Sequence, residues 1–177
     1  MKESGWGKRG SWASRVGAMG LVLMGLAALG ACSAYAPPAR VVGLSAAEVE
    51  RSMGPATGRY TLPDGTTRLE FARGPFGLHT WMIDLDANGR VLRSEQVLTE
   101  RNFATLREGD SRESVLQRLG RPAEARRAGR QQGEVWSWRF DNGNNCLWFQ
   151  VSIVDGRLRH PAYAIDPSCD AGGNDRS

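Results

Sequence analysis

Alternation of apolar and polar residues predicts eight short β-strands, in two groups of four. Within each run successive side chains point to opposite faces, and Gly, Asn and Asp residues separate the runs, as is typical of hairpin turns. The strands are expected near residues 58–62, 67–72, 78–85 and 90–98 in the first group and near 123–128, 134–140, 146–153 and 157–163 in the second. Each group therefore predicts an antiparallel meander.

A short amphipathic helix is expected before each group of strands. Residues 43–54 and 109–120 match at an offset of 66 positions, with Gly, Ser, Val, an apolar residue and Gly at the same spacing. Apolar pairs four residues apart give each helix one apolar stripe. These pairs are Val49 with Met53 and Val115 with Leu119. Helices this short need a packing partner, because they are not stable alone in water.

Capping residues mark both ends of each predicted helix. Ser45 and Glu48 have the spacing of a capping box. In the second helix the corresponding Ser111 is also read as a cap, and Asp110 with Glu113 offers the same chemistry one residue earlier. Gly54 and Gly120 suit left-handed C-caps, and a proline follows each.

These elements predict an α+β fold of two tandem helix-plus-antiparallel-meander repeats, with the helices packed on one face of a curved sheet. Alternation assigns one face of the strands to the core. The core set is Leu69, Phe71, Trp81, Ile83, Leu85, Trp136, Trp138, Phe140, Leu147, Phe149, Val151 and Ile153.

The opposite strand face is polar but holds a few large side chains. Trp and Arg are residue types that often anchor protein interfaces. The candidates for binding a partner are Arg68, Met82, Arg139, Trp148 and Gln150. The alternative is an ordinary solvated face, on which Trp148 packs under the C-terminal tail or a loop.

The N-terminal segment predicts export. Sixteen uncharged residues, 16–31, follow a basic stretch, which is the layout of a secretory signal and is short for a membrane span. Leu29, Gly30, Ala31 and Cys32 resemble the bacterial lipobox, which implies cleavage before Cys32 and lipid on that cysteine. The alternative is an ordinary cleaved signal with an incidental cysteine.

The lipobox resemblance also carries an expectation about location. Two or more acyl chains hold a protein stably on a membrane. Because Ser33 and not Asp follows the cysteine, the enteric sorting rule implies the outer membrane, with the domain facing the periplasm.

Five segments are expected along the chain. They are a signal peptide (1–31), a lipidated N-terminus and tether (32–42), a first repeat (43–102), a second repeat (103–169) and a flexible tail (170–177).

Charge gives no case for nucleic-acid binding. The formal net charge is +4, but residues 1–31 contribute +3 of it, so the other 146 residues carry only +1.

The three cysteines predict one disulfide. If Cys32 carries lipid, Cys146 and Cys169 remain in an oxidising compartment and are expected to pair. The bond would close a loop with 22 intervening residues, worth roughly 3 kcal/mol on the chain-entropy model.

Candidate catalytic chemistry is sparse. The two histidines, His79 and His160, are far apart in the sequence, and no His or Cys stands at zinc-ligand spacing near another. The spacing of Asp84, Asp86 and Asn88 resembles the start of an EF-hand calcium-binding loop, but no helices are predicted to flank these residues. We therefore expect no enzyme activity, no metal, no small-molecule substrate and no cofactor apart from the covalent lipid.

Residues 103–122 resemble the opening of the SmpA/OmlA family of outer-membrane lipoproteins. The shared pattern is an apolar residue, Gly109, a capped helix with Val115, and Leu119-Gly120-x-Pro122. That family includes the small lipoprotein of the outer-membrane β-barrel assembly machine. The tandem layout also resembles β-lactamase-inhibitor-protein-like modules.

The resemblance implies a non-enzymatic, outer-membrane-anchored lipoprotein that binds another envelope protein, in outer-membrane protein assembly or envelope maintenance. The alternative is a tethered protein-inhibitor or ligand-binding module that uses the open sheet face.

Overall fold

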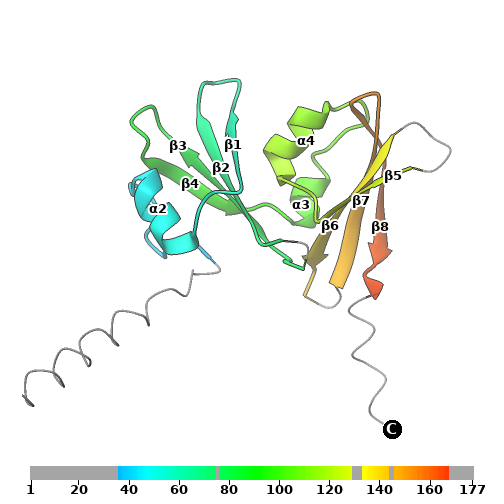
Figure 1. Ribbon diagram of the computed structural model, residues 1–177, viewed down its shortest axis with the longest axis horizontal. Coiled ribbons are helices and arrows are strands. Elements are labelled where there is room, and N and C mark those ends of the chain that lie inside the picture. Colours follow the sequence, from blue (N-terminus) through cyan, green and yellow to red (C-terminus); the bar gives the residue numbers. More distant parts are fainter. Residues whose placement is uncertain (1–35, 75, 129–132, 144–145, 168–177) are drawn as a thin grey trace, which may run out of the picture. The chain divides into compact units, whose positions relative to one another are not determined.

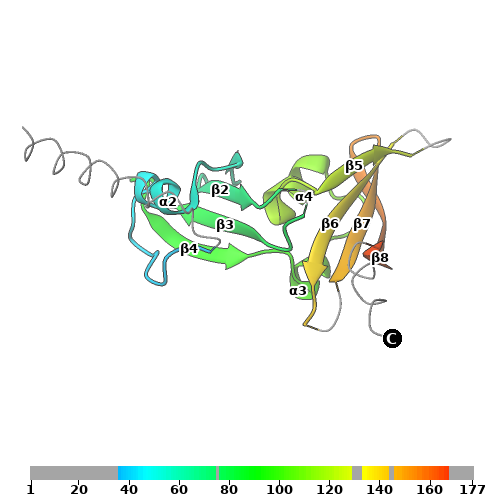
Figure 2. The same cartoon turned by 60° about the horizontal axis from the view of Figure 1, so that its bottom comes forward.

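The computed structural model describes residues 36–167 except 75, 129–132 and 144–145, all within one compact unit that begins at Ala34. Two four-stranded antiparallel sheets dominate it (Figures 1 and 2). Sheet 1 consists of β1 (Gly58–Thr61), β2 (Thr67–Ala72), β3 (Thr80–Leu85) and β4 (Val91–Gln96). Sheet 2 consists of β5 (Glu124–Arg127), β6 (Glu134–Asp141), β7 (Cys146–Val154) and β8 (Arg157–Ile165). The described helices are α2 (Ala46–Met53), α3 (Glu100–Phe103) and α4 (Arg112–Leu119).

The predicted fold class was wrong. The chain is predominantly antiparallel β, with two separate sheets and few short helices, and not a pair of helix-plus-meander repeats packed on one face of a curved sheet. Strand order is sequential in both sheets, and β4 does not pair with β5. Alternation shows which residues share a strand face, but it does not show whether the edge strands of two meanders pair.

Individual strands lie where the alternation placed them. Each of the eight overlaps its predicted range, with ends that differ by up to two residues. The assigned apolar face is also confirmed, since Leu69, Ile83, Trp136, Trp138 and Phe149 are almost fully buried. The periodic side-chain pattern therefore identified strands and faces correctly.

The first helix, α2, begins with the predicted capping box. Ser45 accepts a hydrogen bond from the Glu48 backbone N–H, and the Glu48 carboxylate accepts one from the Ser45 N–H. Val49 and Met53 point into a core shared with Leu69 and Phe71 of sheet 1. The helix thus covers the face of sheet 1 that carries Leu69 and Phe71, which we call its first face.

Of the two N-caps that the sequence offers for α4, the structure uses Ser111 and not Asp110. Ser111 caps the helix by accepting from the Ser114 N–H at 3.1 Å. Asp110 instead accepts from the Arg107 N–H at 2.9 Å and from Arg118 at 3.1 Å. Both α2 and α4 therefore begin with a serine cap.

Both C-cap glycines have positive φ but extended ψ, so the predicted left-handed helical C-caps were wrong. Gly54 has φ 84° and ψ 176°, and Gly120 has φ 77° and ψ −171°. This region of backbone space is almost restricted to glycine.

Sequence patterning missed α3, which has only four residues. Thr99 caps it, and its buried Phe103 stacks on Phe149 with ring centroids 4.2 Å apart. Phe103 also meets Phe140 edge-on at 4.8 Å. One turn of helix is too short to show a period, although it places a central side chain of the sheet 2 core.

The helix α4 contacts both sheets. Val115 and Leu119 belong to the core of sheet 2 together with Trp136 and Trp138. On its other side, Gln117 and the following residues meet the second face of sheet 1, which is the face opposite α2. Sheet 1 is therefore covered on both faces.

Candidate functional site

The five predicted partner-binding residues separate into two groups. Arg68 and Met82 lie on the second face of sheet 1 and are buried, with 9% and 2% of their surface exposed. Arg139, Trp148 and Gln150 lie on the second face of sheet 2, opposite α4, and are partly exposed. The predicted open face therefore does not extend to sheet 1, because α4 covers it.

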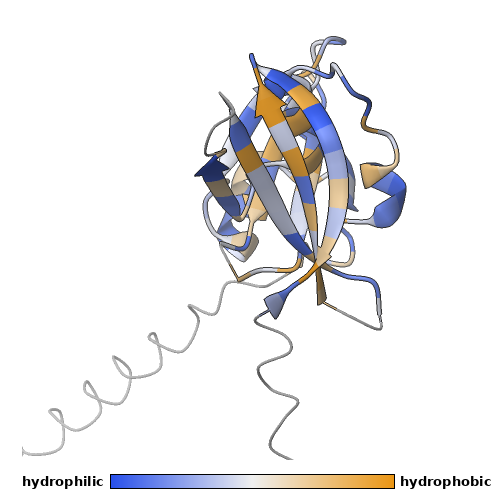
Figure 3. Cartoon of the chain, turned by 90° about the vertical axis from the view of Figure 1, so that its right-hand side faces the viewer, coloured by the Kyte–Doolittle hydropathy of each residue, from blue (hydrophilic) through white to orange (hydrophobic). Residues whose placement is uncertain are grey.

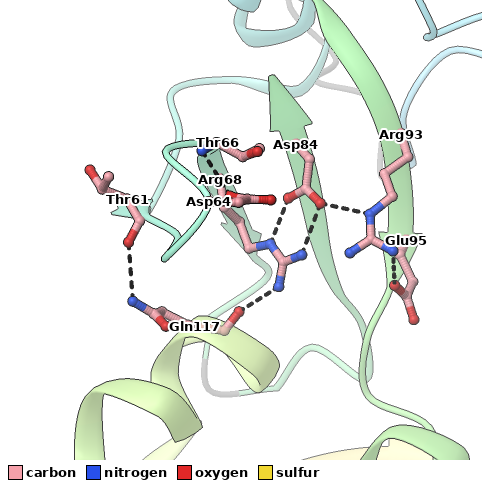
Figure 4. A network of polar contacts seen from close by, with 8 residues as sticks. All are labelled: Thr61, Asp64, Thr66, Arg68, Asp84, Arg93, Glu95 and Gln117. Atoms are coloured by element: carbon pink, nitrogen blue, oxygen red, sulfur yellow. Dashed lines mark hydrogen bonds and ion pairs between the residues drawn. The ribbon is translucent and has the colours of Figure 1, made fainter. Parts of the chain in front are cut away.

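Arg68 ties the two halves of the described unit together (Figure 4). Its guanidinium donates two hydrogen bonds to Asp84, at 2.6 and 2.9 Å, and a third to the Gln117 carbonyl oxygen at 2.8 Å. Asp84 also accepts from Arg93 at 2.6 Å. A buried arginine whose guanidinium donates to three fixed oxygen atoms has a structural role and is not accessible to a binding partner.

Burial alone would raise the pKa of Asp84. The hydrogen bonds and positive charges of Arg68 and Arg93 outweigh it and hold the pKa of that carboxyl below its ordinary value. Asp84 is thereby kept ionised between the two arginines. It does not point toward Asp86, whose carboxylate accepts from the Asn88 and Arg90 backbone N–H groups as a turn former.

The second face of sheet 2 carries no helix among the described residues, and we call it the open face. Ser137, Arg139, Trp148 and Gln150 share it through the register pairs Ser137↔Gln150 and Arg139↔Trp148. Gln150 Nε2 donates to Ser137 Oγ at 2.9 Å. Figure 3 shows the hydrophobic and hydrophilic positions alternating along these strands. Trp148 is thus a large apolar side chain on a mostly polar surface.

Arg139 lies at the centre of an aromatic cluster on this face. Its guanidinium carbon is 4.7 Å from the centroid of the Trp148 ring and 5.2 Å from that of Phe76. Arg139 Nε lies 3.2 Å from a carboxylate oxygen of Asp166, which is fully buried. The cation–π contacts and the ion pair fix the arginine in place and hold the two rings beside it.

Sequence reasoning missed Phe76 and Asp166 as members of this cluster. Phe76 belongs to the connection between β2 and β3 of sheet 1, and 78% of its surface is exposed. Asp166 directly follows β8. For Phe76 the available signal was a phenylalanine beside Gly74 and Gly77 in a predicted connection, since an aromatic residue in a loop is often exposed and can mark a binding surface. Asp166 had no such signal.

These residues border a groove of about 590 Å³. Trp148, Phe76, Ile165 and other apolar groups line it beside four charged side chains. Two of these, Glu124 and Arg126, pair with each other at 2.6 Å. The described lining residues include no serine, cysteine or histidine. The groove therefore offers aromatic surface and hydrogen-bonding groups, and its chemistry suits binding better than covalent catalysis.

The two histidines lie apart from this groove. His79 lies in the connection before β3, and exposed His160 contacts Glu108 at 3.8 Å. Within the described residues no group of three or more His, Cys, Asp or Glu side chains could hold a metal ion.

Cys146 is disulfide-bonded. Its expected partner Cys169 lies outside the described residues, so that pairing stays a prediction. The lipobox residues Leu29, Gly30, Ala31 and Cys32 also lie outside them. No helix in the described part of the chain is long and apolar enough to cross a membrane.

No family model and no curated protein matches this chain. Membership of the SmpA/OmlA family remains a prediction from residues 103–122.

Proposed function

We propose that this chain is a non-enzymatic lipoprotein, anchored to the outer membrane by lipid on Cys32, whose domain faces the periplasm and binds another envelope protein. The binding surface is the open face of sheet 2 around Trp148. Its role lies in outer-membrane protein assembly or envelope maintenance.

The Arg139 cluster is the observation that carries this proposal. Aromatic and arginine side chains contribute most of the binding energy at many interfaces, and fixing them in advance lowers the entropy cost of binding. Here Arg139 is held by Asp166, Trp148 and Phe76 before any partner arrives. A merely solvated face would not need a stacked arginine supported by a buried carboxylate.

The groove around the cluster supplies the apolar surface that an interface needs. Phe76 and Ile165 have 78% and 66% of their surface exposed, and both line it. Exposed apolar side chains gathered around one groove favour a protein partner.

A pull-down from detergent-solubilised envelopes tests the face. We expect an envelope protein to co-purify with the wild type, and its yield to fall at least tenfold with the double variant Trp148→Ala, Phe76→Ser. Arg139 is left unchanged, because reversing its charge would place a second carboxylate beside buried Asp166.

Leu92→Ser is the matched control. Leu92 is also an exposed apolar side chain, 53% accessible, but it lies on β4 of sheet 1. The partner should be retained at wild-type yield with this variant. Equal recovery with the wild type, the double variant and the control would contradict binding through the open face.

Lipid on Cys32 has its own test. Radioactive palmitate should label the wild type and not Cys32→Ser, and the variant should move from the membrane fraction to the soluble fraction. Unlabelled but exported wild-type protein would instead fit an ordinary cleaved signal.

A further inference from the structure

A second groove, of about 500 Å³, lies away from the open face of sheet 2. It is bordered by β1 and β5, which are edge strands of sheets 1 and 2, with α4 contributing between them. Its lining residues are Gly58, Arg59, Tyr60, Arg112, Leu116, Arg121, Pro122, Ala125 and Trp136. Its size is typical of a ligand-binding groove.

The charged lining of this groove is entirely cationic. Arg59, Arg112 and Arg121 are exposed, and no Asp or Glu lines the groove. The rest of the lining is small, apolar or aromatic. An apolar floor with a cationic rim complements a ligand that carries both apolar groups and carboxylates.

Two of the arginines are held in position. The Arg112 guanidinium lies 4.8 Å from the centroid of the Trp136 ring, and one of its nitrogens is 3.3 Å from the Glu134 carboxylate. Arg121 donates to the Thr57 carbonyl oxygen at 2.8 Å. A guanidinium carries five N–H donors, so each keeps donors for a carboxylate.

The carboxylates beside the groove are already engaged. Glu134 accepts from Trp136 Nε1 at 2.8 Å in addition to its contact with Arg112. Buried Glu70 accepts hydrogen bonds from Thr57 and Tyr60. Burial, with the hydrogen bond to Glu70, raises the pKa of Tyr60, which keeps its hydroxyl a donor. Three arginines outnumber the two carboxylates Glu134 and Glu70, so the groove retains a surplus of positive charge.

We propose that this groove binds an extended acidic peptide segment of a partner protein, in which carboxylate and apolar side chains alternate. An extended peptide turns successive side chains to opposite sides. One side would reach the arginines and the other would pack on Leu116 and Ala125. The neighbouring edge strands favour a peptide over an anionic lipid, because unpaired strand edges can bind a peptide backbone.

This site does not depend on the open face of sheet 2. A partner could use either groove or both, so failure of one proposal leaves the other testable.

Fluorescence anisotropy with the full-length protein in non-ionic detergent tests the proposal. The probe is a fluorescein-labelled nonapeptide of alternating Glu and Val, compared with one of alternating Lys and Val, and protein-free micelles give the baseline. We expect the acidic peptide to bind at least tenfold more tightly than the basic one.

Two variants act inside the groove by different means. Arg59→Glu reverses a rim charge, and Ala125→Trp fills the groove without changing charge; each should weaken binding of the acidic peptide at least tenfold. Circular dichroism and thermal unfolding would check that both variants fold.

Arg159→Glu is the matched control. It makes the same charge reversal on exposed β8, at the opposite edge of sheet 2 from β5, and should change the affinity less than twofold. Equal losses with Arg59→Glu and Arg159→Glu, or no loss with Ala125→Trp, would overturn the proposal in favour of diffuse charge attraction.

Water-soluble dihexanoyl phosphatidylglycerol separates peptide from lipid. We expect it to compete weakly with the acidic peptide. If it binds in a way that depends on Arg59 and Ala125 while the peptide does not, the groove is a lipid site and the peptide proposal is wrong.

Discussion

The second faces of sheet 1 and sheet 2 carry similar kinds of side chain in different surroundings. On sheet 1, Arg68 and Met82 are buried against α4 and the residues that follow it. On sheet 2, Arg139 and Trp148 border an open groove. An arginine beside a large apolar side chain therefore stabilises the fold in sheet 1 and forms a candidate binding cluster in sheet 2. What differs is whether a helix covers the face.

The arginines of the two faces also have different partners. Arg68 makes hydrogen bonds to Asp84 and to a helix carbonyl, which bring separate elements together. Arg139 pairs with Asp166 and stacks on two aromatic rings that remain accessible. The two arginine side chains are similarly buried, with 11% and 14% of their surface exposed. The groups that each one contacts, and not residue type or burial, distinguish the two roles.

The largest expected difference between buried and open positions concerns two tryptophans. Trp138→Ala should lower the free energy of unfolding by about 4 kcal/mol, because it leaves a cavity in the core and removes the hydrogen bond to the Gly120 carbonyl oxygen. Trp148→Ala should cost less, about 1 to 2 kcal/mol, because this side chain is partly exposed and its removal leaves no closed cavity. Urea unfolding of both variants measures the difference, and equal losses would mean that the open face is as closely packed as the core.

The next largest expected loss of stability concerns the ion pair between Arg68 and Asp84. Asp84→Ala should destabilise the protein by about 3 kcal/mol, because it leaves a buried guanidinium without its carboxylate. Gln150→Ala, on the open face, should cost less than about 1 kcal/mol. Comparable losses for the two variants, measured by chemical unfolding, would contradict the contrast between the faces.

Gly120 tests how closely α4 approaches sheet 1. A Cβ there would lie 3.0 Å from atoms of Glu70, Thr80 and Met82, at a φ of +77°. Gly120→Ala should cost about 2 to 3 kcal/mol from strain and crowding together. Gly65→Ala adds a Cβ at φ +83° in open space and should cost about 1 kcal/mol. The difference in thermal unfolding between the two variants measures the crowding together with the extended ψ of Gly120, and equal losses would contradict a close approach of α4 to sheet 1.

Lowering the pH should reduce the stability of the protein through Asp84, and this is the smallest of the four predicted effects. Because the folded-state pKa of Asp84 is lowered, its contribution is present above the unfolded-state value of about 3.9 and is lost as the pH falls through the folded value. Asp84→Asn should therefore lose less stability than the wild type when the pH is lowered below about 4. Parallel stability–pH curves for the two proteins would show that the carboxylate is not held ionised.

Sequence patterns predicted local elements better than their assembly. The capping box at Ser45 and the buried face of Trp136 and Trp138 follow from interactions within one helix or one strand. At the second helix the sequence left Ser111 and Asp110 as possible caps, and Ser111 caps the helix because the Asp110 carboxylate contacts Arg107 and Arg118. Arg68 was misassigned because its partner Gln117 lies 49 residues away.

The candidate site was predicted in part. Arg139, Trp148 and Gln150 share a face by strand parity and register, which alternation can reveal. Phe76 and Asp166 come from other elements, and only the folded chain brings them to Arg139. The groove lined by Arg59, Arg112 and Arg121 had no sequence signal, because its arginines come from three separate segments.

The sequence alone determined where the eight strands and the helices α2 and α4 form and which strand face is apolar, because hydrophobic periodicity and capping act over a few residues. Tertiary structure decided that the strands form two sheets, that α4 covers the second face of sheet 1, and that the corresponding face of sheet 2 stays open. Those outcomes depend on contacts such as Arg68 with Gln117 and Gly120 with Met82. Such contacts join residues that are distant in the chain, and no local pattern records them.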